Sequence, residues 1–322
     1  MFLKPREIPI QLQKEDALLR LLPKSHPKYD DIKKSTQKGW AGYRGEKELD
    51  YQLSFLPANQ YYIIPHIRIP IDSQFFQIDT LILCSNFALL IESKNIYGTL
   101  HFDYASQQVT RTYKDQTEGF SNPIQQVKRQ KFQFQRWLNT HFKKIIPCHH
   151  LVSIGFPKTI VKAPNSVYQH VLHAEHIPEK IAALHKLDSS QNLTTYMIKK
   201  ISNLLIEHNT PLEFDVIEYY KIQKNELLTG ILCPQCARYH LRRAHSFWEC
   251  PSCDFKSHEI HVPKINDFLT IFGQISIQEC HSLMGLSSRH TARRILQSMN
   301  LTMINKGRST IYKKPVTDAQ HP

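Results

Sequence analysis

Three apolar runs between residues 61 and 95 constrain the fold of this chain most strongly. They are YYIIPHIRIP, FQIDTLILC and NFALLIESKN, and Ser85-Asn86 offers a turn between the second run and the third. Short runs rich in Ile, Leu, Tyr and Phe that are bounded by turn residues are typical of buried strands. We therefore expect a sheet in which the second and third runs form an antiparallel hairpin.

Two acids and a lysine interrupt this apolar hairpin. Because alternate residues of a strand share a face, Glu92 and Lys94 lie on one side while Ile91 and Ser93 face the other. The hairpin would bring Asp79 to the same end of the sheet. Burying two carboxylates together is costly unless a divalent cation such as Mg²⁺ joins them. The alternative is a solvated polar face on which these residues have no chemical role.

Helical and strand-like segments surround the hairpin in alternation. An amphipathic helix is expected between Trp40 and Phe55, and Asn122-Pro123 is a typical opening for a helix over 122–142. Further strands are expected from HLVSIGF and SVYQHVLH, and further helices from EKIAALHKL and LTTYMIKKISNLLIEH. This order predicts an α/β domain over 37–187. The other expected parts are an N-terminal helical extension (1–36), a helical connector (188–225), a cysteine module (226–262), a C-terminal domain (263–316) and a tail (317–322).

The motifs of this domain resemble a known family. The pattern G-x-x-G-E, then I-D, then L-I-E-S-K-N-x-x-G, then N-P-x-x-Q is similar to the nuclease-related domain (NERD) family, itself similar to the PD-(D/E)xK restriction-type nucleases. The resemblance implies a restriction-endonuclease-like core, which is a central mixed sheet flanked by helices. It also implies a catalytic set of Glu46, Asp79, Glu92, Lys94 and Gln126. Asp79 and Glu92 would hold Mg²⁺ or Mn²⁺, and Lys94 would be the catalytic lysine.

Four cysteines form the second chemical motif. Cys233-x-x-Cys236 and Cys250-x-x-Cys253 are two C-P-x-C pairs separated by 13 residues. This spacing is typical of a tetrahedral Cys₄ site in a zinc ribbon. Four thiolates complete the coordination shell of Zn²⁺, so we expect the zinc to be structural. Two redox pairs, or an accidental spacing, are the alternatives.

The C-terminal segment has the pattern of a winged helix-turn-helix. ISIQECHSLMGL predicts a helix that ends at Gly285, and Ser287-Ser288 predicts the N-cap of a second helix, RHTARRILQSMN. LTMINKGRSTIYKK predicts strand, turn and strand, which would form the wing. The expected DNA-binding residues are Arg289, His290, Arg293, Arg294, Lys306 and Arg308. A helical protein-interaction domain with a basic surface is the alternative.

The charge balance favours a polyanionic partner. Lys and Arg number 41 against 28 Asp and Glu, which gives a net charge of +13. We find no signal peptide and no apolar stretch of membrane-spanning length, and the cysteine usage favours a reducing compartment, so we expect a cytoplasmic protein without a membrane partner.

Together these patterns predict a divalent-metal-dependent deoxyribonuclease that zinc-ribbon and winged-helix modules deliver to DNA. The rival hypothesis is a DNA-binding regulator whose NERD domain is a scaffold or a partner-binding surface. RNA stays an alternative substrate, because net charge does not distinguish the two nucleic acids. The sequence leaves the choice between a monomer and a homodimer open.

Overall fold

The structure is a computed structural model of the chain, and it describes residues 1–103, 106–188, 190–238, 240–306 and 309–315. The chain divides into two compact units. The first contains Met1–Ile8 and Lys38–Leu212, and the second contains Pro9–Gln37 and Glu213–Pro322. Each unit is therefore assembled from two separate stretches of the chain.

A mixed five-stranded sheet forms the centre of the first unit. Its strands lie in the order β1-β2-β3-β7-β9, antiparallel from β1 to β3 and parallel from β3 to β9. The bounds are β1 (Tyr62–Ile71), β2 (Gln74–Leu83), β3 (Ala88–Lys94), β7 (Cys148–Ile154) and β9 (Val171–His173). Leu83 pairs with Ala88 across the Ser85-Asn86 turn. The expected hairpin of β2 and β3 is thus confirmed.

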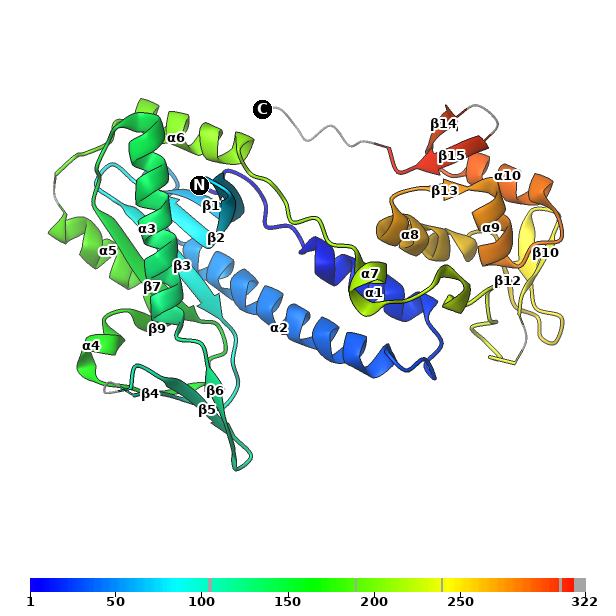
Figure 1. Cartoon of the computed structure of the whole chain (residues 1–322), viewed down its shortest axis with the longest axis horizontal. Coiled ribbons are helices and arrows are strands. Elements are labelled where there is room, and N and C mark those ends of the chain that lie inside the picture. The colour runs from blue at the N-terminus through cyan, green and yellow to red at the C-terminus, as the bar shows by residue number, and fades with distance from the viewer. Residues whose placement is uncertain (104–105, 189, 239, 307–308, 316–322) are drawn as a thin grey trace. The chain divides into compact units, whose positions relative to one another are not determined.

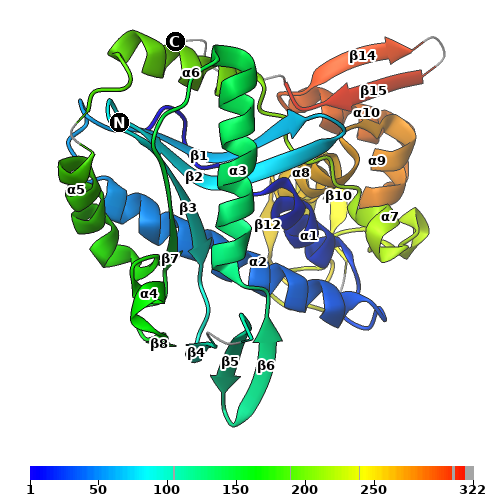
Figure 2. The same cartoon turned by 60° about the vertical axis from the view of Figure 1, so that its left-hand side comes forward.

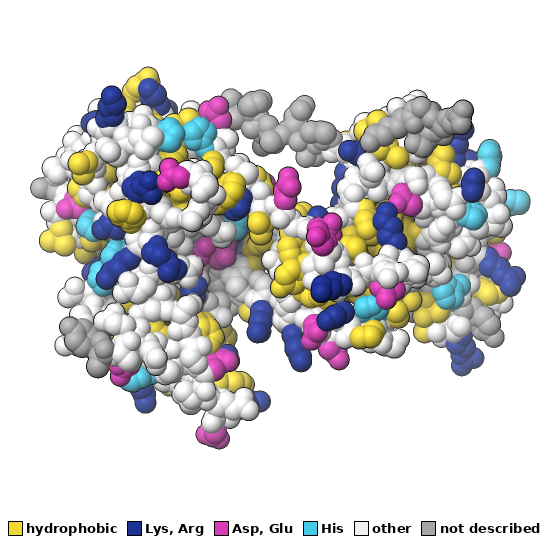
Figure 3. Space-filling view, in the orientation of Figure 1, with side chains coloured by type: hydrophobic (Ala, Val, Ile, Leu, Met, Phe, Trp, Pro, Cys, Tyr) yellow, Lys and Arg dark blue, Asp and Glu magenta, His cyan; other side chains and the backbone are white. Residues whose placement is uncertain are grey.

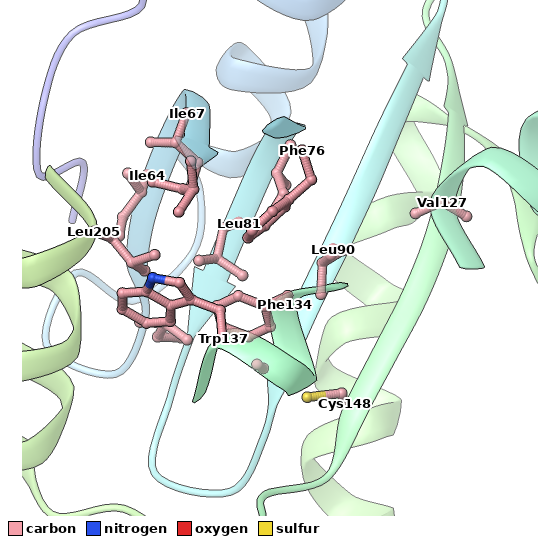
Figure 4. Packing of buried hydrophobic residues seen from close by; sticks show 14 of the residues in the cluster. Ile64, Ile67, Phe76, Leu81, Leu90, Val127, Phe134, Trp137, Cys148 and Leu205 are labelled. Atoms are coloured by element: carbon pink, nitrogen blue, oxygen red, sulfur yellow. The ribbon is translucent and has the colours of Figure 1, made fainter. Parts of the chain in front are cut away.

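Helices cover both faces of this sheet (Figures 1 and 2). The helices packed against one face are α3 (Pro123–Phe142) and α6 (Thr195–Glu207), and those on the other are α2 (Tyr29–Leu53) and α5 (Ile177–Leu187). The side chains alternate accordingly: Leu81 and Leu90 join the core under α3, whereas Ile82 and Leu89 join the core under α2. Figure 4 shows Phe134 and Trp137 of α3 in the first of these two cores.

A second, smaller sheet belongs to the same unit. Its strands lie in the order β6-β5-β4-β8, with bounds β4 (Thr99–Phe102), β5 (Val109–Tyr113), β6 (Gln116–Phe120) and β8 (Ile160–Lys162). The sequence analysis did not predict β5 and β6, because most of their side chains are exposed or half-buried and leave little apolar pattern. The strand expected over 166–173 was partly wrong. The segment Asn165–Tyr168 is a short helix, α4, and only β9 and the 3₁₀ helix η1 (Ala174–His176) follow it before α5.

Helix α2 begins at Tyr29, well before the helix that was expected from Trp40, and it contains the Gly42-x-x-Gly45-Glu46 motif. The glycine at position 45 serves close packing. A Cβ atom at Gly45 would lie 2.5 Å from the Cβ of Asn95, and one at Gly155 would lie 2.7 Å from the Cα of Gly45. The helix therefore approaches the ends of β3 and β7 closely, and this contact carries Glu46 to the sheet.

The second unit surrounds its own apolar core, to which all its larger elements contribute. The N-terminal and connecting elements are α1 (Ile10–Leu21), α7 (Val216–Tyr220) and the 3₁₀ helix η2 (Lys224–Glu226). A three-stranded sheet follows, made of β10 (Arg242–Ala244), β11 (Phe247–Glu249) and β12 (Lys256–Ser257). The C-terminal elements are α8 (His261–Phe272), β13 (Ile275–Ser276), α9 (Ile277–Met284), α10 (Arg289–Ser298), β14 (Thr302–Lys306) and β15 (Ser309–Lys313).

The helix boundaries in the C-terminal segment follow the predicted capping residues. Helix α9 ends where Gly285 adopts a left-handed conformation, and the side chain of Ser288 caps α10 by accepting a hydrogen bond from the backbone N–H of His290. Strands β14 and β15 pair as an antiparallel hairpin, and β13 joins them. Within the described part of the chain, no helix is both long and apolar enough to cross a membrane.

Candidate active site and zinc site

The two acids of the hairpin lie side by side at its open end. Pairing of Thr80 with Ile91 places Asp79 opposite Glu92 at the next position along the strands. Both are buried, with exposed fractions of 8% for Asp79 and 2% for Glu92. Asp79 Oδ2 accepts a hydrogen bond of 3.0 Å from the backbone N–H of Ser93, which fixes this carboxylate against β3. The structure thus places both acids where the sequence predicted them.

Helix α3 supplies the partners that orient Glu92 and Lys94. Lys94 Nζ donates to Glu92 Oε1 at 2.6 Å and to Gln126 Oε1 at 3.1 Å, and Gln130 Nε2 donates to Glu92 Oε2 at 2.9 Å. Asn122 caps this helix and Pro123 begins it, so the predicted N-terminal signal determines where the helix starts. Gln126 therefore lies beside Lys94 as predicted. Gln130 is a member of the site that the sequence analysis missed, although it is one helical turn beyond Gln126.

Glu46 reaches the same site through a buried arginine. Arg6 Nη1 donates to Glu46 Oε2 at 2.6 Å, and Arg6 also makes a bidentate pair with Asp50 at 2.8 Å for both contacts. The remaining donors reach Thr80 Oγ1 at 2.8 Å and the carbonyl oxygen of Asp79 at 3.0 Å. The Arg6 side chain is fully buried. It is held there because Phe2 and Leu3 add a short parallel bridge beside β1.

Sequence reasoning missed Arg6 and Asp50 altogether. Arg6 is 40 or more residues from each of its partners, and a single arginine in KPREIPI forms no pattern. Asp50 gave one available signal, because it lies one helical turn after Glu46 and therefore on the same face of α2.

The site carries more negative than positive charge. Burial raises the pKa of Glu46 to about 7, and the neighbouring charge of Asp79 adds to the effect, whereas Arg6 opposes it. Burial, with Asp79 next in importance, also raises the pKa of Glu92, and Lys94 opposes that shift. Each acid would therefore be stabilised in its ionised form by one more cation.

The residues fit a divalent cation held by two carboxylates. Asp79 Oδ1 has no hydrogen-bond partner within the described residues, so this oxygen is free to act as a ligand. Both oxygens of Glu92 already accept hydrogen bonds, from Lys94 and from Gln130. Mg²⁺ and Mn²⁺ accept such a site, because they retain waters alongside one or two protein carboxylates. Glu46 is held by Arg6 and is not gathered with Asp79 and Glu92 into a three-ligand set within 4.8 Å.

The four cysteines converge as their spacing predicted. Among the described residues, Cys233, Cys236, Cys250 and Cys253 are the one group of three or more His, Cys, Asp or Glu ligand atoms that lie within 4.8 Å of one another. The Sγ atoms of Cys233 and Cys253 are 3.6 Å apart, as are those of Cys236 and Cys250. A tetrahedron with zinc–sulfur bonds of about 2.3 Å has edges of roughly 3.8 Å, so Zn²⁺ fits this cluster.

Backbone groups support the thiolate form of this cluster. The backbone N–H of Arg238 lowers the pKa of Cys236 to about 7, and the N–H of Ser252 donates to Cys250 Sγ at 3.4 Å. Such outer contacts orient metal ligands. The four-cysteine site could therefore hold zinc.

The predicted DNA-binding residues divide between two hollows of the second unit. Arg289, His290 and Arg293 line one of about 500 Å³ together with Thr310, whereas Arg294 lines another. Lys306 ends β14, and Arg308 lies outside the described residues. On the face drawn in Figure 3, the described Lys and Arg side chains are scattered and form no continuous patch.

Comparison with known proteins identifies one family. The model of the nuclease-related domain (NERD) matches residues 41–155, which include the hairpin of β2 and β3 and the start of α3. The match confirms the resemblance stated from the motifs and indicates a nuclease-related function for the first unit. No curated protein and no solved structure matches the chain.

Proposed function

We propose that the chain is a divalent-metal-dependent nuclease that hydrolyses phosphodiester bonds of DNA. One observation carries the proposal. In a segment that matches the nuclease-related domain, Asp79, Glu92 and Lys94 lie together at one end of the sheet, and Lys94 Nζ is 2.6 Å from Glu92 Oε1. Two buried acids with a lysine beside them, one of them with a raised pKa (Glu92), are typical of a site that binds a cation and a phosphate.

Asp79 and Glu92 would hold the Mg²⁺ or Mn²⁺ ion. The bound ion would lower the pKa of a water molecule and balance the charge of the scissile phosphate. Asp79 offers Oδ1 for this purpose while Oδ2 is fixed by the N–H of Ser93. Glu92 would have to exchange one of its two hydrogen bonds for the ion. Because Lys94 Nζ also donates to Gln126 Oε1, the lysine is the partner that can shift.

Lys94 would orient the attacking water and bind the phosphate. An ammonium group has three donors, and two of them reach Glu92 and Gln126, so the third is available to a substrate oxygen. Gln126 positions the lysine by accepting its hydrogen bond. Glu46 and Arg6 would act behind the two metal-binding acids. Arg6 donates to the carbonyl oxygen of Asp79 and so holds the backbone of this acid in place, and Glu46 accepts a hydrogen bond from Arg6.

The second unit would deliver the nuclease to DNA. We assign the Cys₄ module to the zinc-ribbon class, and we assign α8, β13, α9, α10, β14 and β15 to the winged helix-turn-helix class. Helix α10 would enter the major groove and would present Arg289, His290 and Arg293 to the DNA.

Cleavage assays with defined substrates test this proposal. Supercoiled, linear and single-stranded DNA, and RNA, are incubated with the zinc-loaded protein and Mg²⁺, Mn²⁺ or EDTA. Cleavage is expected with a divalent ion and is expected to fall by roughly a thousandfold in Glu92→Gln and Lys94→Ala, because Glu92 would hold the ion and Lys94 would bind the phosphate. Exposed residues of α5 and α6 supply matched controls, Glu179→Gln and Lys200→Ala, which should cleave like the wild type.

Two outcomes would reject the proposal. Undiminished cleavage by Lys94→Ala would show that the activity arises elsewhere. No cleavage of any substrate, together with retained DNA binding, would favour the rival function, a DNA-binding regulator that uses its nuclease-related domain as a scaffold.

A further inference from the structure

A large cavity in the second unit lies between the hairpin of β10 and β11 and the C-terminal helices. Its volume is about 880 Å³, which is within the range of about 300–1,000 Å³ usual for small-molecule sites. The lining comes from three places: the hairpin of β10 and β11, the start of α8, and α10 with the loop that follows it. The proposed nuclease chemistry uses none of these groups.

Two arginines without acidic partners face this cavity. Arg243 and Arg294 have neither an ion pair nor a hydrogen bond within the described residues, and the Nη1 atom of Arg243 is buried without a partner. Burial lowers the pKa of Arg243, and the charge of Arg294 lowers it further, so the two guanidinium groups are close enough to repel each other. Arg243 is half-buried and Arg294 is exposed, so an anion bound in the cavity would pair with both guanidinium charges.

The protein positions Arg243 although it leaves the charge unpaired. Arg243 pairs across the sheet with Trp248, and its Cζ atom lies 5.5 Å from the centre of the indole ring. Trp248 Nε1 in turn donates to Nδ1 of His261 at 3.2 Å. His261 lines the cavity and is only 5% exposed. Because its Nδ1 accepts a hydrogen bond, the neutral ring carries its proton on Nε2, a third donor for an anion.

The remaining lining suits an anion that carries an organic group. Glu259 is the one acidic side chain among the described residues of the wall, so the cavity is cationic overall. Hydroxyl and amide groups line it as well, among them Ser246 and Asn266, and Ile295 and Leu301 add apolar surface. An inorganic phosphate would fill a small part of the volume. A phosphate that carries a sugar and a base would use the guanidinium, amide and apolar groups together.

We propose that this cavity is a nucleotide site in which Arg243 and Arg294 bind the phosphate group. The phosphate could belong to a free mononucleotide or to the 5′ end of a DNA strand, and the chemistry of recognition is the same. The site is distinct from the acid cluster of the first unit and does not depend on the nuclease activity proposed above.

Binding of defined probes to the zinc-loaded full-length protein tests the site. The probes are deoxyadenosine 5′-monophosphate, deoxyadenosine, and a 5′-phosphorylated trinucleotide, with affinity measured by calorimetry in EDTA-free buffer without Mg²⁺. We expect the phosphorylated probes to bind at least roughly tenfold more tightly than deoxyadenosine, because charge-assisted hydrogen bonds are the strong ones. Equal binding of both phosphorylated probes would indicate a free nucleotide, and binding of the trinucleotide alone would indicate a DNA end.

Three variants distinguish the site from a general effect of charge. Arg243→Gln and Arg294→Gln should each weaken binding of the phosphorylated probe by roughly tenfold. Arg242→Gln is the matched control, since Arg242 is the neighbouring residue of β10, is exposed and does not line the cavity. Without a ligand, the two cavity variants should also unfold at temperatures no lower than that of Arg242→Gln, because each removes the repulsion between Arg243 and Arg294. The proposal is wrong if no phosphorylated probe binds, if deoxyadenosine binds equally well, or if Arg242→Gln weakens binding as much as the cavity variants do.

Discussion

The two candidate metal sites of this chain are built in opposite ways. The zinc site takes all four ligands from two short turns, between Cys233 and Cys253. The acid site takes its groups from the N-terminal segment, α2, β2, β3 and α3, so that residues as distant as Arg6 and Gln130 contribute to it. The first is encoded by spacing, and the second by the topology of a whole domain.

This difference decides what each site requires to exist. The four thiols belong to a module with three very short strands, so a bound metal would supply much of its folding free energy. The acid site instead rests on two large cores on either side of a five-stranded sheet. Its ionised groups are held by the fold at an electrostatic cost. Zinc should therefore stabilise its module, whereas the fold should stabilise the acid site.

Removal of zinc should give the largest effect on stability. Structural zinc in small modules is worth roughly 10–16 kcal/mol of folding free energy, so Cys250→Ser is expected to unfold β10, β11 and β12. Hydrogen exchange of these strands and the zinc content of the protein measure the loss. Ser252→Ala changes an exposed neighbour and should leave both unchanged. Loss of exchange protection in β2 and β3 as well would contradict the view that the two sites are stabilised independently.

Replacement of Arg6 should have the next largest effect, and it should fall on the first unit. Arg6→Ala leaves the buried Asp50 and the half-buried Glu46 without their partner, which typically costs about 3–5 kcal/mol. Urea unfolding, monitored through the hydrogen exchange of β2, measures the decrease in the free energy of unfolding. The control is Arg44→Ala, which replaces an exposed arginine of α2, the helix that carries Glu46 and Asp50.

A double substitution separates the charge pair from simple packing. Arg6→Ala combined with Asp50→Asn should cost less than the sum of the single substitutions, because the two residues interact directly. Additive costs would show that Arg6 acts only by filling space.

The sequence predicted the local features of both sites and few of the distant contacts. The convergence of the four cysteines, the cap at Asn122, the helix end at Gly285 and the hairpin of β2 and β3 each depend on residues that are close together in the chain, and all were predicted correctly. Asp79, Glu92 and Lys94 were found because β-strand alternation and one hairpin suffice to join them. Such features are visible in a single sequence, since their partners lie within about 20 residues of one another.

The rest depends on tertiary packing. Arg6 contacts Glu46 and Thr80 only because the N-terminal segment pairs beside β1, and no local pattern encodes that pairing. The start of α2 at Tyr29 was missed, because the expected helix began only at Trp40. In the structure, Gly45 is required by contact with Asn95, and packing overrides its low helix propensity.

The electrostatic cost of the acid site should appear as a dependence of stability on pH. The pKa of Glu46 rises from 4.5 to about 7 in the folded protein. Between these values the folded state binds more protons than the unfolded state, so stability should fall as pH rises from about 4.5 to about 7, by roughly 1–3 kcal/mol. Urea unfolding at a series of pH values, monitored in β2, measures the slope.

Two changes should flatten this slope. Glu46→Gln removes the titrating group, and Glu179→Gln, which changes an exposed acid, should leave the slope as it is. Added Mg²⁺ should also flatten it, because a cation bound by Asp79 and Glu92 would weaken the repulsion of Glu46 by Asp79. A slope that persists in Glu46→Gln would assign the titration to another group, with Glu92 the first to test because its pKa is raised as well.

The smallest effect is expected at the surface of the second unit, where the proposed contact of Arg293 with DNA would be exposed and screened by salt. Arg293→Gln should weaken DNA binding by roughly tenfold and reduce the slope of log affinity against log salt by about one, because one phosphate contact is lost. Arg242→Gln, the same change on exposed β10, should alter the affinity less. An equal decrease in both variants would mean that DNA responds to the net charge of the unit alone. Binding measured from low to high salt with both variants therefore determines whether α10 forms a defined contact with DNA. A selective loss in Arg293→Gln would mean that DNA binding, like the two candidate metal sites, depends on the positions of particular residues.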